Sequence, residues 1–145
     1  MERFQQVAQD YAGTASGALA RLEAGGLQQE LEQTDEAVQT WRLSADELAV
    51  DDPIRALLLV RIAASLEAEL RWIEAAETYQ EAATIERYPL RYTALADAAR
   101  CFAEAGERHR ALETFERLES EAPQHRVPEH INARMRELRA QEHLE

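Results

Sequence analysis

The feature that most constrains the fold of this chain is a short motif that occurs three times. The stretches EAVQTW at 36–41, EAAETY at 74–79 and RALETF at 110–115 each hold an alanine, then a threonine and an aromatic residue one helical turn later. The alanines recur at intervals of about 37 residues, and a fixed period of this length is the signature of a repeat architecture. We therefore expect stacked copies of one small unit rather than a single irregular fold.

Each motif continues in a pattern that is typical of an amphipathic helix. Apolar or small residues recur at offsets of about 4, 7 and 11 residues, which places them on one helical face. These residues are Ala37, Trp41, Ser44 and Leu48; Ala75, Tyr79 and Ala82; and Ala111, Phe115, Leu118 and Ala122. Similar stripes precede the second and third motifs, namely Leu59, Ile62, Ala63, Leu66 and Leu70, and Leu95, Ala98, Ala99 and Phe102. The pattern predicts pairs of helices.

Residues typical of helix starts and turns separate the predicted helices. Asp52 and Pro53 form a side-chain cap followed by a proline at the first helical position. Pro89 is expected to start a helix in the same way, and Gly106 lies at the turn between two helices, where a positive φ costs a glycine little. These signals support a succession of short helices and turns.

The repeats resemble the tetratricopeptide family. The best match, residues 92–123, has small, aromatic, turn and terminal residues where that family has them, namely Ala99, Phe102, Gly106, Ala111, Phe115 and Pro123. Residues 56–87 and 18–49 match less completely. The resemblance implies an all-α solenoid of three helix pairs forming a single domain over 1–145. In such arrays the repeated alanine allows close helix approach and units share a core, so we expect Trp41, Tyr79 and Phe115 to be buried.

The two ends differ from the repeats. Residues 127–143 hold an apolar stripe with Pro128 near its start, which predicts a C-terminal capping helix. Residues 1–17 predict an N-terminal helix whose stripe includes Phe4, Val7 and Tyr11. Two interpretations of this stripe remain open: it caps the first repeat, or it forms a short coiled-coil seam between two copies of the chain.

Composition narrows the classes of partner. The chain is 46% hydrophobic and 30% charged, with a formal net charge of −12, and arginine supplies all of its basic residues. Such a surface repels nucleic acid phosphates and anionic lipid. No apolar run approaches the length of a membrane span of about 20 residues, and no signal-peptide pattern is present. We expect a cytoplasmic protein, or a periplasmic or envelope protein if an N-terminal anchor has been removed.

The sequence offers little for catalysis. Cys101 lies on a predicted buried stripe, and a single cysteine forms neither an intrachain disulfide nor a cysteine-based metal site. The histidines show no metal-ligand spacing, and no phosphate-binding loop is present. We therefore expect no enzyme activity, no cofactor and no metal. Trp72, placed in a turn, is either a surface aromatic or packed over the neighbouring pair.

The resemblance also implies where a partner binds. In tetratricopeptide proteins the concave wall comes from the first helix of each pair. Carried over to this chain, the wall consists of Leu57, Val60, Arg61, Ala64, Thr93, Ala96, Asp97 and Arg100, with Leu19, Leu22, Glu23 and Gly26 in the first unit. Arg61 and Arg100 are expected to be isolated cations that recognise an acidic side chain. The alternative is that this wall packs against the N-terminal helix.

The expected function is non-enzymatic protein binding, with a helical or extended segment in the concave groove. Two finer interpretations are open. The repeat spacing and final helix are similar to bacterial envelope repeat proteins that assist secretion or outer-membrane assembly. The size, acidity and three repeats also resemble the cytoplasmic type III secretion chaperones, which hold apolar client proteins.

Overall fold

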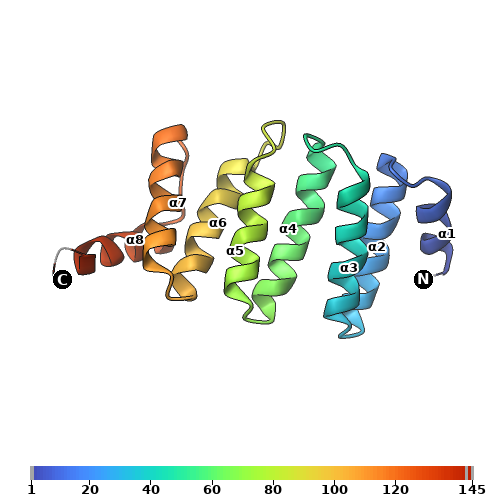
Figure 1. The fold of residues 1–145 in the computed structure, drawn as a ribbon, viewed down its shortest axis with the longest axis horizontal. Coiled ribbons are helices and arrows are strands. Elements are labelled where there is room, and N and C mark those ends of the chain that lie inside the picture. Colours follow the sequence, from blue (N-terminus) through green and yellow to red (C-terminus); the bar gives the residue numbers. More distant parts are fainter. Residues whose placement is uncertain (1, 143, 145) are drawn as a thin grey trace.

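The structure, a computed structural model, describes residues 2–142 and 144. Within that part of the chain the secondary structure consists of eight α-helices and no strand (Figure 1). They are α1 (Glu2–Asp10), α2 (Ala15–Glu30), α3 (Thr34–Glu47), α4 (Pro53–Ala68), α5 (Trp72–Ala83), α6 (Arg91–Glu104), α7 (Arg108–Glu121) and α8 (Glu129–Glu142). The all-α prediction is confirmed.

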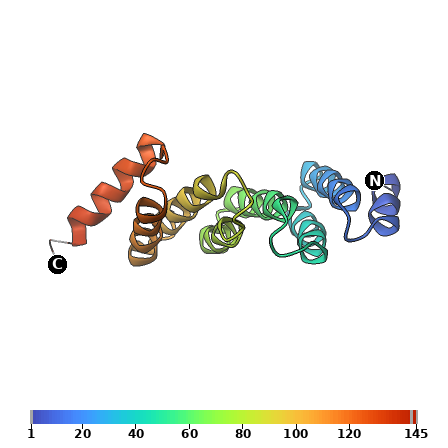
Figure 2. The same cartoon turned by 90° about the horizontal axis from the view of Figure 1, so that it is seen from above.

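The helices form an elongated two-layer array. Each helix packs against the next one in the chain, and the first helices α2, α4 and α6 lie in one layer, with the second helices α3, α5 and α7 in the other (Figure 2). The first helix α2 also contacts α4, and α6 contacts α8. Because neighbours along the sequence are neighbours in space, the core is a continuous band along the array.

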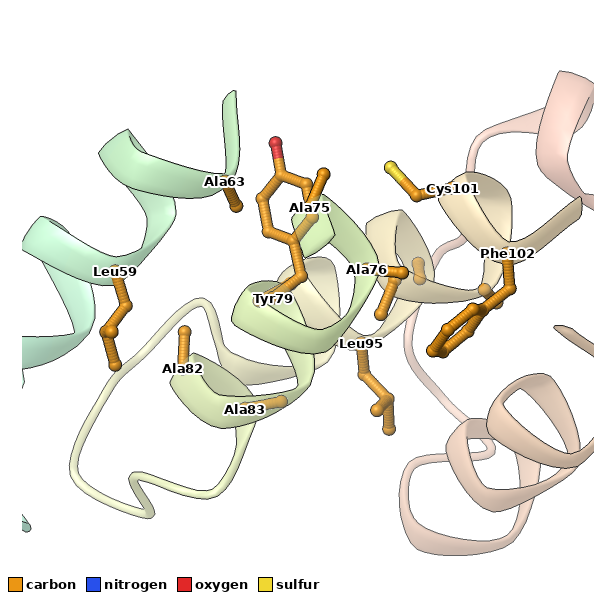
Figure 3. Close-up of a cluster of buried hydrophobic side chains, with 14 of the residues drawn as sticks. Leu59, Ala63, Ala75, Ala76, Tyr79, Ala82, Ala83, Leu95, Cys101 and Phe102 are labelled. Carbon is orange, nitrogen blue, oxygen red and sulfur yellow. The ribbon is translucent and has the colours of Figure 1, made fainter. Parts of the chain in front are cut away.

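The repeated motif lies at the closest helix contacts. Ala37, Ala75 and Ala111 are completely buried, and so, nearly, are the aromatic residues one turn later, Trp41, Tyr79 and Phe115. Figure 3 shows the alanines of α5 between the larger side chains of α4 and α6, such as Leu59 and Phe102. Small side chains thus bring the backbones together while the aromatic rings fill the space beside them.

The predicted starts of α4 and α6 have different outcomes. Asp52 accepts a hydrogen bond from the Ile54 backbone N–H at 2.8 Å, with Pro53 as the first residue of α4, as predicted. The prediction for Pro89 was wrong, because α6 begins at Arg91 and its N-cap residue has no side-chain cap. The preceding connection is longer than a capped proline start requires, so Pro89 lies in that loop.

The turns inside the three pairs share one backbone conformation. Glu32, Leu70 and Gly106 occupy equivalent positions, five residues before each repeat alanine, and have φ values of 60°, 58° and 77°. The prediction for Gly106 is confirmed. The other two positions hold side chains in the left-handed region, which disfavours L-residues with a Cβ. Trp72 follows one such turn as the first residue of α5, half-buried against the core rather than in the turn.

The N-terminal end corrects one prediction. The predicted helix over 1–17 is interrupted: α1 ends at Asp10, Gly13 has a φ of 73°, and Thr14 caps α2 by accepting a hydrogen bond from the Gly17 N–H. The apolar stripe had suggested continuity across this break. Residue 1 lies outside the described residues.

At the other end α8 packs against α6 and α7. Its buried side chains are Ile131, Met135 and Leu138, and Pro128 immediately precedes its first residue. Residue 143, the predicted last residue of this helix, lies outside the described part of the chain. None of the helices in the described residues is both long and apolar enough to cross a membrane.

Candidate binding wall on the first helices

The wall residues predicted on α4 and α6 differ in their exposure. Leu57 is 45% exposed, and Arg61, Ala64 and Thr93 are also exposed. Val60 is half-buried and packs against the core. Ala96 is only 1% exposed, so it is a core residue and is not accessible to a partner. Ala96 therefore lies on a side of α6 that neighbouring helices cover.

Two exposed leucines occupy the same place in successive first helices. Leu19 on α2 is 50% exposed and corresponds to Leu57 on α4. The two helices are in contact, and Gln29 on α2 donates a hydrogen bond to the Ser65 hydroxyl on α4 at 2.6 Å. Beside them, a Cβ added at Gly26 would meet nothing within 4 Å. This half of the wall therefore presents two open leucines together with the exposed side chains of Glu23 and Arg61.

Arg61 supplies a cation beside these leucines. Its guanidinium carbon lies 6.0 Å from the centroid of the Trp41 ring, within the range of a cation–π contact. Trp41 is held in turn by its indole N–H, which donates to the Leu22 carbonyl at 3.0 Å. Among the described residues Arg61 makes no ion pair, so its charge remains available to a ligand.

Arg100 is not the isolated cation that the sequence predicted. It forms a bidentate pair with Glu67, at 2.9 and 2.8 Å, and its Nη2 also donates to Asp97 at 3.2 Å. This cluster joins α4 to α6 and carries two carboxylates for one guanidinium. It acts as a link between repeats, and sequence reasoning missed Glu67. The available signal was the 33-residue separation from Arg100, close to one repeat.

The environment of this cluster changes the titration of its members. Burial disfavours the charged form of Glu67, but hydrogen bonds from Arg100, with smaller ones from Cys101 and Tyr79, outweigh it and lower the pKa. Burial raises the pKa of Asp97 despite Arg100. Burial also raises the pKa of the Cys101 thiol to about 12, so this buried cysteine is a thiol at neutral pH and lacks the thiolate that a nucleophile needs.

Other concave regions lie away from this wall. A hollow of about 360 Å³ lies between α1 and the α2–α3 pair, with Ala8, Ala24 and Leu43 in its lining. Another of about 500 Å³ lies between the α6–α7 turn and α8, beside Gly106 and Leu138. No group of three or more His, Cys, Asp or Glu side chains in the described residues is arranged to hold a metal ion.

Two of the predicted seam residues, Phe4 and Val7, lie on α1, and the third, Tyr11, follows it directly. Phe4 and Val7 are each 38% exposed, and Tyr11, just after the helix, is more exposed. Ala8 is buried on the side of α1 that packs against α2. The helix therefore contacts the first repeat through a narrow face and leaves its larger apolar side chains partly open.

Comparison with solved structures agrees with this architecture. A crystal structure of nearly identical TPR-like repeats from a proposed kinesin light chain of Podosopora anserina has a TM-score of 0.71 and 21% sequence identity, over 97% of this chain and 77% of that chain. The crystal structure of a single-substitution variant of those repeats gives a TM-score of 0.69 at 20% identity, with the same coverage. The sequence matches no family model and no curated protein. The fold of this chain is a tetratricopeptide-like α-solenoid.

Proposed function

We propose that this chain is a non-enzymatic protein-interaction module that binds an apolar helical or extended segment along the wall formed by α2 and α4. The observation that carries the proposal is the pair of exposed leucines, Leu19 and Leu57, at equivalent positions on adjacent first helices. Exposed leucines at the same position of two contacting helices present apolar side chains on one face of the array, here called the leucine strip, which suits the apolar side of a partner segment.

A positive charge beside the leucine strip favours apolar segments that also carry an acidic residue. Arg61 lies next to the strip, with its guanidinium over Trp41 and with no carboxylate partner in the described residues. It can bind a carboxylate of the partner. Arg100 has no such role in this proposal, because Glu67 and Asp97 already accept its hydrogen bonds. The acid-recognising part of the wall is therefore on α4 alone.

Peptide display on the purified chain tests this assignment. A random peptide library selected on the wild-type protein should yield apolar peptides, and Leu57→Glu should weaken their binding at least about tenfold, equivalent to 1.4 kcal/mol. The matched control is Leu43→Glu, because Leu43 is a 63% exposed leucine on the second helix α3. The control should bind as the wild type does. Thermal melting of both variants verifies that each is folded.

Two results would overturn the proposal. If Leu43→Glu lost the peptides while Leu57→Glu kept them, binding would lie on the layer of second helices. If both variants kept them, the leucine strip would have no role. Arg61→Glu refines the test, since it should discriminate only against those selected peptides that carry an acidic residue.

Adaptor and chaperone are the finer roles within this proposal. An adaptor would hold a short segment of a folded partner, whereas a secretion or envelope-assembly chaperone would hold an apolar client and keep it soluble. The open strip on α2 and α4 is compatible with either occupant. A client bound as a chaperone substrate should precipitate when the Leu57→Glu variant replaces the wild-type chain, whereas a folded adaptor partner should stay in solution.

A further inference from the structure

The helix α1 has the register of a second helix. The spacing of Phe4, Val7 and Tyr11 is the same as that of Trp41, Ser44 and Leu48 in the first repeat. The residue after Val7 fits the same register. Ala8 corresponds to Ala45 in α3 and to Ala83 in α5, and all three alanines are buried. The array thus opens with the second half of a repeat unit.

The contacts of α1 fit this assignment. In α3, Trp41 packs against α2, the first helix of its own pair: its indole donates to Leu22, and a Cβ at Gly25 would clash with its ring. Ala45 lies on the neighbouring side of α3 and is buried by the packing between repeats. Ala8 is similarly buried where α1 packs on α2. Within the described residues no first helix packs against Phe4 and Val7.

The exposed fractions of two equivalent aromatic side chains show that the outer face of α1 has no helix packed on it. Trp41 is 0% exposed, whereas its counterpart Phe4 is 38% exposed. Figures 1 and 2 show α1 at the end of the array, with no helix of the described chain on its outer side. An amphipathic helix packed there would bury the three apolar side chains and extend the core by one more layer.

The charges beside this face point to a second copy of α1. Arg3 and Asp10 are seven residues apart and so lie on the same flank of the stripe. In an antiparallel pair of α1 helices, Arg3 of each copy lies opposite Asp10 of the other, whereas in a parallel pair Arg3 would lie opposite Ala8 and gain no ion pair. Arg3 makes no ion pair within the described residues, and Asp10 is exposed, with only the Gln6 amide donating to it.

The local charge at this end adds no net repulsion between two copies. The chain carries a formal charge of −12, which opposes association of two copies. Residues 2–22 are formally neutral, because Glu2 and Asp10 are balanced by Arg3 and Arg21. Two copies that meet through α1 therefore bring together segments that carry no net charge.

We propose that the chain forms a weak two-fold dimer through antiparallel α1 helices, with Phe4, Val7 and Tyr11 at its centre and reciprocal Arg3–Asp10 ion pairs beside them. Each α1 packs against the other in the way that the first helix of a pair packs against the second. A nine-residue helix buries far less than the ~1,200–2,000 Å² of a standard stable interface. The dimer is accordingly concentration-dependent.

Sedimentation velocity of the intact chain tests the dimer. The wild-type mass should rise from 16.5 kDa towards twice that value as the concentration increases into the millimolar range. Val7→Glu places two carboxylates at the two-fold axis and should keep the chain monomeric, while Leu90→Glu, at a 55% exposed leucine just before α6, should leave the dimer unchanged. A wild-type chain that stays at 16.5 kDa at millimolar concentration overturns the proposal.

A charge exchange tests the antiparallel arrangement without altering the apolar face. Arg3→Glu and Asp10→Arg should each weaken self-association, because each places like charges opposite one another. The double variant should restore it, and an equimolar mixture of the two single variants should form a heterodimer with two complementary pairs. Circular dichroism verifies folding of each variant. If neither the double variant nor the mixture associates, the antiparallel pairing is wrong.

Discussion

The two ends of this array are closed in different ways. At the C-terminal end, α8 lies at a steep angle to the other helices (Figure 1) and buries three apolar side chains against α6 and α7. At the N-terminal end, α1 is a second helix that buries one alanine, Ala8, while Phe4 and Val7 remain partly exposed. Within the described residues the last repeat is thus covered by a helix with three buried side chains, and the outer face of α1 is left partly open.

This difference teaches that a position in the repeat does not determine burial by itself. Phe4 and Trp41 share a register, yet among the described residues only Trp41 has the first helix of its own pair to pack against. Stability in such arrays is approximately a sum of units and the interfaces between them. The C-terminal interface should therefore contribute more free energy of unfolding than the N-terminal one.

The largest expected effect is at the covered end. Met135 is completely buried in α8, so Met135→Ala leaves a cavity and should cost about 2–5 kcal/mol of unfolding free energy. Phe4→Ala at the other end should cost less, about 1 kcal/mol, because α1 can detach without unfolding the repeats. Urea unfolding at low protein concentration measures both. Equal losses would show that α1 stabilises the array as much as α8 does.

A smaller effect is expected from one pair of equivalent alanines. Ala45 in α3 and Ala8 in α1 are both buried between a second helix and the next first helix. Ala45→Leu should overpack a contact inside the array and cost about 1–3 kcal/mol, whereas Ala8→Leu should mainly release α1. Hydrogen exchange can separate the outcomes: Ala8→Leu should lose protection in α1 alone. Loss of protection throughout the array would mean that α1 is an integral layer.

The repeat pattern allowed the sequence to predict the helix pairs and their core. Period, alanine spacing and the Asp52–Pro53 start all depend on local chemistry, and each reappears in the structure. The break between α1 and α2 was missed because the apolar stripe continues across it, although Gly13 and Thr14 carried the turn and cap signals.

The wall was predictable only in part. Exposure of Leu57 follows from helical phase, which can be read from the order of apolar and polar residues. The engagement of Arg100 by Glu67 depends on how α4 and α6 are aligned with each other, and the apolar stripes leave that alignment undetermined to within a turn. The burial of Ala96 has the same origin, since phase alone does not tell which side of α6 the neighbouring helices cover.

Substitutions in the equivalent turns at Leu70 and Gly106 should change the free energy of unfolding by a still smaller amount, and at Leu70 the change should be stabilising. Leu70 and Gly106 share a left-handed backbone, with φ values of 58° and 77°. Leu70→Gly removes a conformational penalty of about 1–2 kcal/mol but adds about 0.5–1 kcal/mol of unfolded-state entropy, so it should stabilise the chain by about 1 kcal/mol or less. Gly106→Leu should destabilise it. A lowered melting temperature for Leu70→Gly would imply that this exposed leucine has a packing role.

The smallest effects are expected at the α4–α6 junction, where the pKa values of two carboxylates, Asp97 and Glu67, are shifted in opposite directions. Burial raises the pKa of Asp97 above its ordinary 3.8, so the folded chain binds that proton more tightly than the unfolded chain does. The ionised carboxylate therefore costs stability at neutral pH, and this cost disappears as the pH falls through the raised pKa. Arg100 lowers the pKa of Glu67 below 4.5 despite its burial. The contribution of Glu67 is favourable at neutral pH and is lost as the pH falls from 4.5 through the lowered pKa.

Substitutions that remove one charge and leave the side-chain volume almost unaltered separate these two contributions. Asp97→Asn should be more stable than the wild type at neutral pH, with an advantage that shrinks on acidification. Glu67→Gln should show a deficit at neutral pH that shrinks likewise. Denaturant midpoints at neutral pH and near pH 3.8 measure both differences. If Asp97→Asn were the less stable variant at neutral pH, its ion pair with Arg100 would outweigh the burial of the charge, and the junction would depend on both carboxylates equally.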